Sequence, residues 1–535
     1  MAIKKRSPKG ARKSLSAMVE RAKSNQSRRP SAGNAPHLIV QARAGTGKTF
    51  TLVEGLNRIM GKPTPGIIPS PQQAAVWEAM QDGPRPGSAT FVAFNRSIAQ
   101  ELVRKVPRGC AAMTLHSMGF RAVCQAYGKV EVNNWKTQNL IEDHLGTDIR
   151  QLRREDPVLV QATEKLVNLS KLELVHNQDG EICDGLQEPE AVLDDLCNRY
   201  EVELNGQRDR VYALVPVILE RAREHTAEVD FSDMIWLPVV NNLPVFRSDL
   251  LLVDEAQDLN RCQQALALRA GSRLVLCGDP CQAIYGFAGA DTESIPRMKT
   301  LLETTPRGCR VLPLTVSRRC GRAIVWEAAQ IVPDFEAFEG NPEGEIITVP
   351  PEQVNGNLGD GDMVLCRVNA PLISLVFRLL KEHRKANIQG RDIGQGLLNL
   401  IDRLKAQDVD GLLERLDDYH HQETQRLYRR KNPSEASLIA LQDKVECIRA
   451  FCDGATDLEK VRATITAIFQ DDSQGGILLS SVHRAKGLEA PRVFILEPGL
   501  MPHPMAKTHW QKEQEQNLKY VAITRAIQTL VWVRQ

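Results

Sequence analysis

HLIVQARAGTGKTFTL (His37–Leu52) joins a short apolar run, a glycine-containing loop and the beginning of a predicted helix. The run at His37–Gln41 is typical of a buried strand, because such strands form continuous apolar segments. The loop occupies Ala42–Gly47, and Lys48 and Thr49 follow it where the helix begins. This order of strand, loop and helix is typical of a loop that binds phosphate groups.

The residue types of this loop suit phosphate chemistry. Gly45 and Gly47 allow backbone N–H groups to surround phosphate oxygens without interference from a Cβ atom. Lys48 is expected to reach the β- and γ-phosphates, and the hydroxyl of Thr49 to ligate Mg²⁺. The pattern AxxxxGKT departs from the usual GxxxxGK[ST] at Ala42, and an ordinary glycine-rich turn is the alternative interpretation. The predicted ATP-binding residues of the loop are Ala42, Arg43, Ala44, Gly45, Thr46, Gly47, Lys48 and Thr49.

The composition is that of a multi-domain globular protein. With 535 residues the chain is too long for a single core, and 42% of its residues are hydrophobic and 25% charged. No run approaches the ~18 apolar residues of a membrane helix, and the N-terminus lacks the apolar core of a secretory signal. The 12 cysteines include no C-x-x-C pair, which favours free thiols over a metal or disulfide site. We therefore expect an intracellular protein, in a prokaryotic or phage-host cytoplasm, with no membrane span.

The net charge of +2 conceals a basic N-terminal segment. Residues 1–36 interleave Ser and Pro with few large apolar residues, so we expect a disordered tail. Such a tail is expected to bind nucleic-acid phosphates, to act as a localisation signal or simply to remain solvated. Its one acidic residue is Glu20, and its basic residues are Lys4, Lys5, Arg6, Lys9, Arg12, Lys13, Arg21, Lys23, Arg28 and Arg29.

Apolar runs alternate with helical patterns in two parts of the chain, which predicts an α/β protein with parallel sheets. Long, charged, amphipathic stretches interrupt each part, and we expect them to be helical insertions. After the first strand, the expected strands are Ala89–Phe94, Cys110–Leu115, Leu250–Asp254, Arg273–Gly278, Arg310–Thr315, Asp362–Cys366, Gly476–Ser481, Arg492–Glu497 and Thr529–Val533.

The segment LLVDEAQD (Leu251–Asp258) places two carboxylates at the end of an apolar strand. In an open α/β sheet, ligands bind outside the carboxyl ends of the strands, which is where the phosphate loop also lies. Asp254 is expected to hold Mg²⁺ through water, and Glu255 to accept the proton of an attacking water. The alternative is that these acids cap a helix N-terminus.

The segment GDPCQAIYGFAGAD (Gly278–Asp291) follows the next strand. Gln282 is well placed to sense a γ-phosphate. Tyr285 and Phe287 form an aromatic pair on a loop, of the kind that stacks on unpaired bases, although two core aromatics are the alternative interpretation.

Taken together, these segments resemble the ordered motifs of superfamily 1 helicases of the UvrD/Rep type. The resemblance covers most of the chain outside the two insertions, and the motifs occur in the order that the family has. The matching segments are Gln41–Thr49, Ala93–Leu102, Thr114–Ser117, Leu251–Asp258, Gly278–Ala290, Leu314–Cys320, Ser480–Glu489 and Asn517–Ala526.

The resemblance implies two RecA-like motor domains with ATP and Mg²⁺ bound in the cleft between them. The first would carry the phosphate loop and the acidic motif, while Arg319 and Arg525 of the second would reach the γ-phosphate, as cationic fingers that stabilise developing charge. Glu489 would lie near the nucleotide sugar. The expected organisation is a tail at 1–36, a first motor domain at 37–120 and 229–309, a helical insertion at 121–228, a second motor domain at 310–405 and 473–535, and a short helical insertion at 406–472.

The resemblance also implies a single-stranded DNA path across both motor domains. Hydroxyls and amides would contact phosphates, and Phe287 would stack on a base. For His116 and His483 a purely structural role is the alternative interpretation. The predicted DNA-binding residues are Asn95, Arg96, Thr114, His116, Phe287 and His483.

Four features depart from the family pattern. Arg318 replaces an aromatic residue that often stacks on adenine, and Ala288 replaces an arginine that often follows the stacking aromatic. The adenine-reading glutamine, usually upstream of the phosphate loop, has Gln72 or Gln73 as downstream candidates, and a plain surface helix is the alternative. The second insertion is shorter than an ordinary domain.

The resemblance thus implies an ATP-dependent helicase and translocase that moves 3′ to 5′ on single-stranded DNA and acts at single/double-strand junctions, in DNA replication or repair. One alternative is a 5′-to-3′ motor of the same superfamily. A helicase–nuclease is disfavoured, because the chain ends at Gln535, shortly after the last predicted strand. The remaining alternative is a DNA-stimulated ATPase that binds or recruits without processive unwinding.

Overall fold

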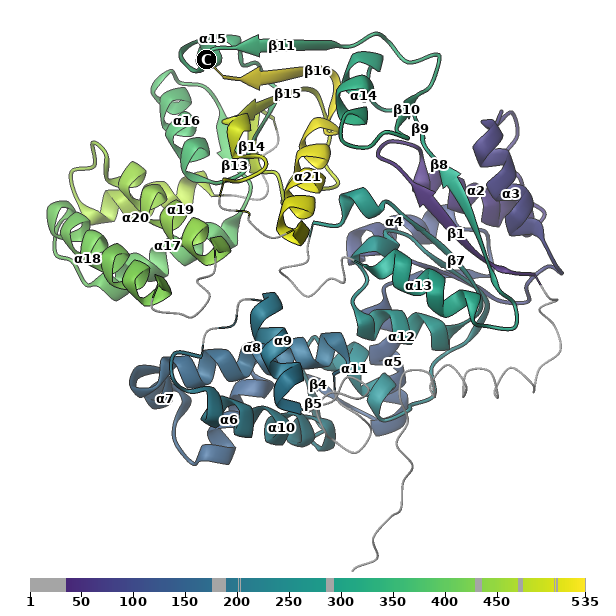
Figure 1. The fold of residues 1–535 in the computed structure, drawn as a ribbon, viewed down its shortest axis with the longest axis horizontal. Helices are drawn as coiled ribbons and strands as arrows, with labels where there is room; N and C mark the ends of the chain where they lie inside the picture. Colours follow the sequence, from purple (N-terminus) through teal and green to yellow (C-terminus); the bar gives the residue numbers. More distant parts are fainter. Residues whose placement is uncertain are drawn as a thin grey trace, which may run out of the picture. The chain divides into compact units, whose positions relative to one another are not determined.

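The structure is a computed structural model that describes residues 35–175, 189–200, 202, 204–284, 293–428, 435–469, 475–504, 506 and 509–534. These residues form two compact units, drawn in Figure 1 with the insertions that each carries. The second unit holds Arg43–Gly47, Cys281–Ile284 and Thr315–Gln535, and the first unit holds the remainder. The predicted tail lies almost entirely outside the described residues, as do Tyr285, Phe287 and Ala288.

The first unit is built on a six-stranded parallel sheet with the order β3-β2-β6-β7-β1-β8. Its central strands are buried on both faces, as expected for an α/β sheet covered by helices, and this is why they read as continuous apolar runs. The strands are β1 (His37–Ala42), β2 (Ala89–Val92), β3 (Cys110–Met113), β6 (Ser248–Val253), β7 (Gly271–Gly278) and β8 (Cys309–Leu314).

One expected boundary lies elsewhere in the structure. Residues 310–315 were expected to open the second motor domain, but β8 pairs with β1 along the whole of His37–Ala42. The first unit therefore continues to Leu314. An apolar run predicts a strand, but it does not say which of two sheets that strand joins.

Helices cover both faces of the first sheet, and α2 and α3 are the pair labelled beside β1 in Figure 1. The N-cap side chains of α3, α4 and α5 accept hydrogen bonds from their own first turns, which explains where these helices begin. The helices are α2 (Lys48–Ile59), α3 (Pro71–Gln81), α4 (Arg96–Lys105), α5 (Leu115–Tyr127), α11 (Asp233–Val240), α12 (Arg261–Ala270) and α13 (Ser294–Glu303).

The first helical insertion belongs to the first unit and shares one continuous apolar core with it. It begins and ends at a small parallel sheet in which β4 (Glu131–Val132) pairs with β5 (Glu228–Val229). Between these strands lie α6 (Lys136–Leu145), α7 (Ile149–Glu155), α8 (Pro157–Glu173), α9 (Pro189–Tyr200) and α10 (Arg208–Glu224).

The second unit has its own six-stranded parallel sheet, with the order β11-β16-β15-β12-β14-β13. The α/β class with two parallel sheets is therefore confirmed. The strands are β11 (Glu345–Val349), β12 (Met363–Cys366), β13 (Ala386–Ile388), β14 (Ile477–Ser481), β15 (Ala490–Leu496) and β16 (Ala526–Val533), and the main flanking helices are α14 (Arg322–Ala329), α16 (Ala370–Lys381) and α21 (His509–Ile523).

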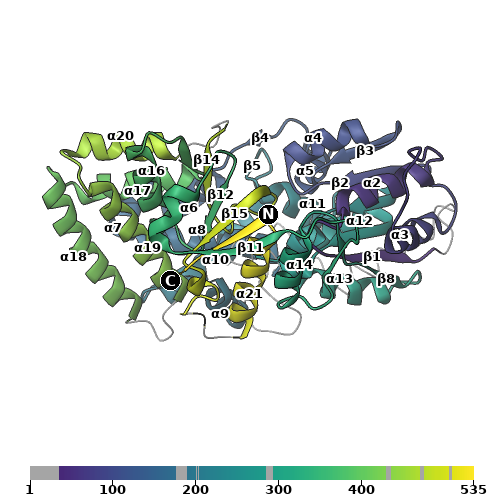
Figure 2. The same ribbon diagram turned by 90° about the horizontal axis from the view of Figure 1, so that it is seen from above.

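The second helical insertion separates β13 from β14. Its first helix begins at Arg391, earlier than the expected start at 406, and packs against its last helix. Figures 1 and 2 both show its helices gathered in one group. They are α17 (Arg391–Leu404), α18 (Val409–Tyr428), α19 (Glu435–Cys452) and α20 (Leu458–Ile468).

Candidate functional site

The phosphate loop leaves β1 at Ala42 and ends where Lys48 opens α2. Gly45 and Gly47 have φ values of 67° and 78°, a left-handed conformation that glycine adopts without steric cost. A Cβ atom on Gly45 would lie 2.4 Å from Cβ of Arg319. The loop therefore requires glycine at this position for its backbone conformation and for the close approach of a neighbouring side chain.

Lys48 lies beside the acidic motif at the carboxyl end of the first sheet. Its Nζ atom is 2.8 Å from Oε2 of Glu255. Burial alone would lower the pKa of Lys48, but the charges of Glu255, Asp279 and Asp254 raise that pKa above its usual value. The lysine is therefore a fixed positive charge at the end of the phosphate loop.

Thr49 and Asp254 form the pair of oxygen ligands that the sequence predicts for Mg²⁺. The hydroxyl of Thr49 donates a hydrogen bond to Oδ2 of Asp254. Burial, and then the charge of Glu255, raise the pKa of Asp254 to about 6. A buried carboxylate with a raised pKa is stabilised by a cation, and a carboxylate with a hydroxyl is a ligand set that Mg²⁺ uses together with water. These residues therefore fit the metal.

Glu255 is held in an unusual backbone conformation, with φ of 52°. Its N–H donates to Oδ1 of Asp254 over 3.0 Å, and the side chain of Gln257 donates to Glu255 Oε2 over 2.6 Å. Gln257 also accepts a hydrogen bond from the backbone N–H of Asp279 over 3.0 Å. This chain of bonds ties the end of β6 to the end of β7 and orients the carboxylate of Glu255.

In the second unit, Arg319 lies against the phosphate-loop segment that belongs to this unit. Its Nε atom is 2.5 Å from Oε2 of Glu489, so the predicted arginine finger and the predicted sugar contact form an ion pair. The N–H of the preceding Arg318 donates to the carbonyl of Gly45 over 2.9 Å. The N–H of Ala44 donates to the hydroxyl of Tyr520 over 2.9 Å.

Arg525 is 2% exposed, and its guanidinium is engaged within the second unit. Its three nitrogens donate to the carbonyls of Val521 and Leu488 and to the hydroxyl of Thr524, over 3.0, 3.1 and 3.2 Å. The structure thus gives Arg525 a place at the end of α21, while Arg319 is the arginine that lies at the loop.

Gln282 is buried, and its backbone carbonyl accepts a hydrogen bond from Nζ of Lys486 over 2.6 Å. Lys486 belongs to the quoted segment Ser480–Glu489, although no role was predicted for it from the sequence. The motif could have indicated this lysine, because a lysine stands at a fixed position within it.

Two of the predicted DNA contacts are helix caps. Oδ1 of Asn95 accepts from the N–H of Ile98 over 2.9 Å, and Oγ1 of Thr114 accepts from the N–H of Ser117 over 3.1 Å. Arg96, the first residue of α4, is exposed. The capping bonds account for these residue types without a nucleic acid, so their role in DNA binding stays a prediction.

His116 stacks on Phe231, with ring centroids 3.9 Å apart and an angle of 19° between the rings. Burial lowers the pKa of His116 to about 4, so the ring is neutral at physiological pH. Phe231 is 60% exposed, which leaves it available to a ligand. Sequence reasoning missed this residue, because it follows the first insertion and no quoted motif contains it.

His483 is half-buried in the second unit. Burial, with the charge of Arg367, lowers the pKa of His483 to about 3. Arg367 itself forms a two-nitrogen ion pair with Glu515, at 2.8 and 2.9 Å. A neutral imidazole suits either a structural role or a contact to an uncharged group, so the role of His483 in DNA binding stays a prediction. Phe287 lies outside the described residues.

The structure also shows the surroundings of residues that depart from the family pattern. The guanidinium of Arg318 lies over the ring of Phe338, 3.9 Å from its centroid. Gln73 is buried, accepts from the N–H of Ser70 in a capping box and donates to Oγ1 of Thr51. Its amide is therefore engaged within the first unit, whereas Gln72 is half-buried.

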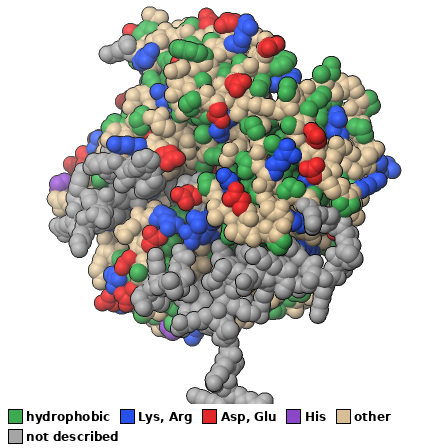
Figure 3. Space-filling view, turned by 45° about the vertical axis from the view of Figure 1, so that its right-hand side comes forward, with side chains coloured by type: hydrophobic (Ala, Val, Ile, Leu, Met, Phe, Trp, Pro, Cys, Tyr) green, Lys and Arg blue, Asp and Glu red, His purple; other side chains and the backbone are tan. Residues whose placement is uncertain are grey.

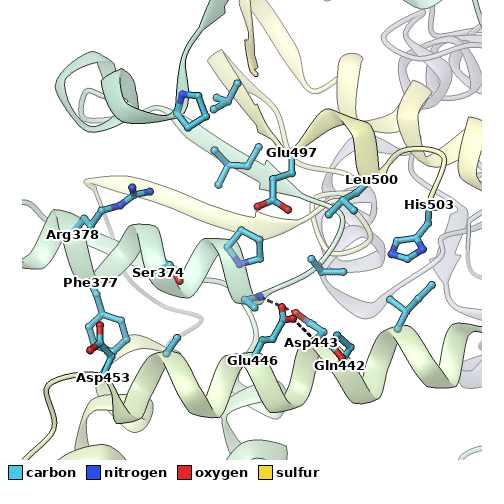
Figure 4. Close-up of a pocket in the computed structure, with 18 of the residues that line it drawn as sticks. Ser374, Phe377, Arg378, Gln442, Asp443, Glu446, Asp453, Glu497, Leu500 and His503 are labelled. Atoms are coloured by element: carbon cyan, nitrogen blue, oxygen red, sulfur yellow. Dashed lines mark hydrogen bonds between the residues drawn. The ribbon is translucent and has the colours of Figure 1, made fainter. Parts of the chain in front are cut away.

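A hollow in the second unit lies away from these residues. It has a volume of about 1020 Å³ in the second unit and is lined by parts of α16, α19 and the segment after β15. Figure 4 shows Glu446 and Glu497 among its walls, while Asp443 accepts backbone hydrogen bonds from Asn369 and Ala370 over 2.8 Å. None of the predicted site residues within the described chain lines it.

Three further observations concern surface charge, groups of metal-ligating side chains and helix hydrophobicity. On the face drawn in Figure 3, side chains of both charges are interspersed. Across the described ranges, no group of three or more His, Cys, Asp or Glu side chains is arranged to hold a metal ion. No helix in the described parts of the chain has the length and apolarity to cross a membrane.

Comparisons with known proteins place these observations in a family. The model of the UvrD/REP helicase N-terminal domain matches residues 73–302, and the model of the UvrD-like helicase C-terminal domain matches residues 376–534. Among solved structures, a complex of arterivirus nonstructural protein 10 (helicase) with DNA aligns over 97% of this chain and 63% of that chain, at 12% identity and a TM-score of 0.33.

Three curated relatives illustrate the likeness. F-box DNA helicase 1 of Gallus gallus is 23% identical over 92% of this chain and 47% of its own length. ATP-dependent DNA helicase PcrA of Staphylococcus epidermidis is 33% identical over 25% of this chain and 17% of its own. DNA helicase II of Escherichia coli is 23% identical over 92% of this chain and 82% of its own. The chain thus matches about half or less of the length of the first two.

The first family model covers β2, β3, β6 and β7 of the first sheet, and the second covers β13, β14, β15 and β16 of the second sheet. The quoted motifs, the sheets and the matched domains agree, and the chain belongs to the UvrD-like helicase family.

Proposed function

We propose that this protein is an ATP-dependent DNA helicase that translocates 3′ to 5′ along single-stranded DNA and unwinds duplexes at single/double-strand junctions. One observation carries the proposal. The phosphate loop, Lys48, Thr49, Asp254 and Glu255 converge at the carboxyl ends of β1 and β6, where the Lys48–Glu255 and Thr49–Asp254 contacts assemble the parts that ATP hydrolysis requires.

Each residue has a role that follows from its position. The backbone N–H groups of the glycine loop would hold phosphate oxygens, and Lys48 would neutralise their charge. Thr49 and Asp254 would hold Mg²⁺, which when bound supplies positive charge to the phosphate oxygens. Glu255, oriented by Gln257, would accept the proton of the attacking water.

The second unit supplies the remaining charge in this proposal. Arg319 lies against Gly45 and would stabilise negative charge that develops on the transferred phosphoryl group. Gln282 would report on the γ-phosphate, and Lys486 would fix the backbone that carries Gln282. Because Arg525 is engaged by Val521, Leu488 and Thr524, it would reach a phosphate only after a change in those bonds.

For the nucleic acid, we propose that the His116–Phe231 stack is a base-binding position of the strand path. A neutral, stacked imidazole beneath an exposed phenyl ring forms the kind of platform on which unpaired bases stack. Asn95, Arg96 and Thr114 would contact phosphates nearby. The names of the curated relatives support DNA as the substrate, and an intracellular location follows from that substrate.

Lys48→Ala tests the assignment. ATPase activity stimulated by single strands should be abolished, because the positive charge that neutralises the phosphates is lost, while the thermal unfolding midpoint should stay near that of the wild type. ATP turnover measured with and without oligonucleotide decides this. Retained turnover in Lys48→Ala would remove the loop from the proposed site.

A second measurement separates helicase from translocase and fixes polarity. Forked duplexes with only a 3′ or only a 5′ single-stranded tail should be unwound from the 3′ tail alone. A protein that hydrolyses ATP on single strands but opens neither fork would be a DNA-stimulated translocase or recruitment module. The compact second insertion, limited to α17–α20 in the described residues, is the observation that favours this second candidate.

A further inference from the structure

The small sheet at the base of the first insertion sends two aromatic side chains out from one end. Its parallel strands β4 and β5 pair Val132 with Val229, and adjacent strands in a sheet lie about 4.8 Å apart. Trp135 follows β4 directly before α6, and Phe231 follows β5 two residues before the start of α11. Because the strands are parallel, both aromatics leave the sheet at the same end.

A buried cluster of four charges joins the two segments behind these aromatics. Nζ of Lys136 is 2.7 Å from Asp233, and Nζ of Lys171 is 2.6 Å from Asp230 and 2.8 Å from Asp233. Lys136, Lys171 and Asp233 are each at most 1% exposed. The cluster therefore fixes the start of α6 to the start of α11.

Backbone bonds complete this connection. The N–H of Asn133 donates to the carbonyl of Val229 over 2.8 Å. The N–H of Asp233 donates to Oδ1 of Asp230 over 2.8 Å, and the hydroxyl of Thr137 donates to Oδ2 of Asp230 over 3.1 Å. Hydrogen bonds from residues before and after each aromatic thus hold the two turns that carry Trp135 and Phe231.

The aromatic side chains themselves face outward. Trp135 is 61% exposed and Phe231 60%, and Val132 beside them is 49% exposed. Within the described ranges, the indole of Trp135 makes no hydrogen bond, ion pair or ring contact. Large apolar side chains at this degree of exposure, next to a ring stack, form a surface that suits flat, apolar ligands.

We propose that Trp135 is a second base-stacking residue, which extends the strand path from the His116–Phe231 stack onto the first helical insertion. This inference rests on the proposed DNA-binding function. Continuity with that stack identifies nucleobases as the occupant. Glu131 and Glu228 on the same strands would repel phosphates, so the contact is to bases and leaves the backbone in solvent. Lys136 and Asp233 act as positioning residues.

The test measures the affinity of a labelled oligothymidylate for the full-length protein by fluorescence anisotropy, over a series of salt concentrations. Trp135→Ala should weaken binding at least about fivefold, as loss of one base–aromatic stack does. Its slope of log affinity against log salt should match that of the wild type, because no phosphate contact is lost. Trp135→Phe should retain most of the affinity.

Three control variants sharpen the result. Trp326→Ala removes an equally exposed tryptophan, 65% exposed on α14, and should leave affinity unchanged. Arg96→Ala should reduce the salt slope by about 0.7, the value for one phosphate contact to a single strand. Phe231→Ala should weaken binding as Trp135→Ala does.

Lys136→Met combined with Asp233→Asn tests the positioning role and keeps the cluster neutral, with Lys171–Asp230 intact. In this background Trp135→Ala should cause little further loss of affinity, because the indole is already misplaced. A full additive loss would refute the positioning role.

The possible outcomes distinguish the role of Trp135 from the proposed DNA-binding function on which it rests. If the wild type fails to bind single strands, the proposed function fails. If it binds, and Phe231→Ala weakens binding while Trp135→Ala does not, only the role of Trp135 is overturned. A changed salt slope in Trp135→Ala would also overturn it, because that result would indicate a phosphate contact.

Discussion

Asp254 makes the activity of this site sensitive to pH. Its pKa is raised to about 6 by burial and by Glu255, so protons compete with Mg²⁺ for this carboxylate below that pH. The magnesium concentration for half-maximal ATPase activity should therefore rise about tenfold per pH unit below pH 6, and stay nearly constant above it. Titrations of Mg²⁺ at several pH values measure this.

The same shift sets the sign of its effect on stability. The folded protein binds this proton more tightly than the unfolded chain, whose aspartates titrate near 3.9. Without Mg²⁺, the contribution of Asp254 therefore opposes folding above pH 6 and is relieved as the pH falls from about 6 to about 4. Asp254→Asn should remove both dependences, and an unchanged magnesium profile in that variant would contradict the assignment.

Sequence patterns predicted residues that stand at fixed positions after recognisable strands. Lys48 and Glu255 stand at fixed positions after β1 and β6, and the carboxyl ends of parallel strands bring them together. Phe231 was not predicted, because its stack on His116 depends on how α5 and α11 pack. The bonds that engage Gln73 likewise follow from packing against α2, which no local spacing reveals.

At the scale of elements, the turn between β1 and α2 depends on Gly45. Gly45→Ala should abolish nucleotide binding and lower the thermal midpoint, because its Cβ would meet Arg319 at 2.4 Å and Ser317 at 2.7 Å while φ stays at 67°. Gly61→Ala is the matched control, since its φ is 72° and nothing lies within 4 Å of the added Cβ. Equal effects of the two variants would show that backbone strain alone is responsible.

The sequence predicted most strands of both sheets. It did not predict which sheet each strand joins, and it missed the shortest strand. Continuous apolar runs such as β6 and β7 are recognisable because both of their faces are buried. β13 has only three residues, and β11 has a single buried position, Val349, so neither produces such a run. β8 was recognised as a strand, but its pairing with β1 is a property of the assembled sheet.

At the scale of the whole molecule, the proposal assigns parts of one reaction to both units. Arg319→Ala should retain ATP binding and lose ATP turnover by about 10³-fold or more, as removal of an arginine finger does. Combined with Lys48→Ala, it should cause little additional loss, because residues that act on one phosphoryl group are not additive. Turnover and binding of a fluorescent ATP analogue measure the two effects separately.

If Arg319→Ala and Lys48→Ala lowered ATP turnover independently, Arg319 and Lys48 would have separate roles. Arg319→Lys is the control, because it keeps the positive charge but not the planar fork of donors. If Arg319→Ala bound ATP no more weakly and turned it over normally, the second unit would have no part in hydrolysis through this residue.

The buried cluster of Lys136, Lys171, Asp230 and Asp233 also constrains how this chain can change in evolution. Loss of any one member leaves an uncompensated buried charge, which costs about 3–5 kcal/mol, a large fraction of the stability of a typical domain. Replacement of the whole set by apolar residues carries no such penalty. Sequences that lack a single member are therefore less stable than either end point, and related sequences should lose these residues in neutral lysine–aspartate pairs or as a complete set.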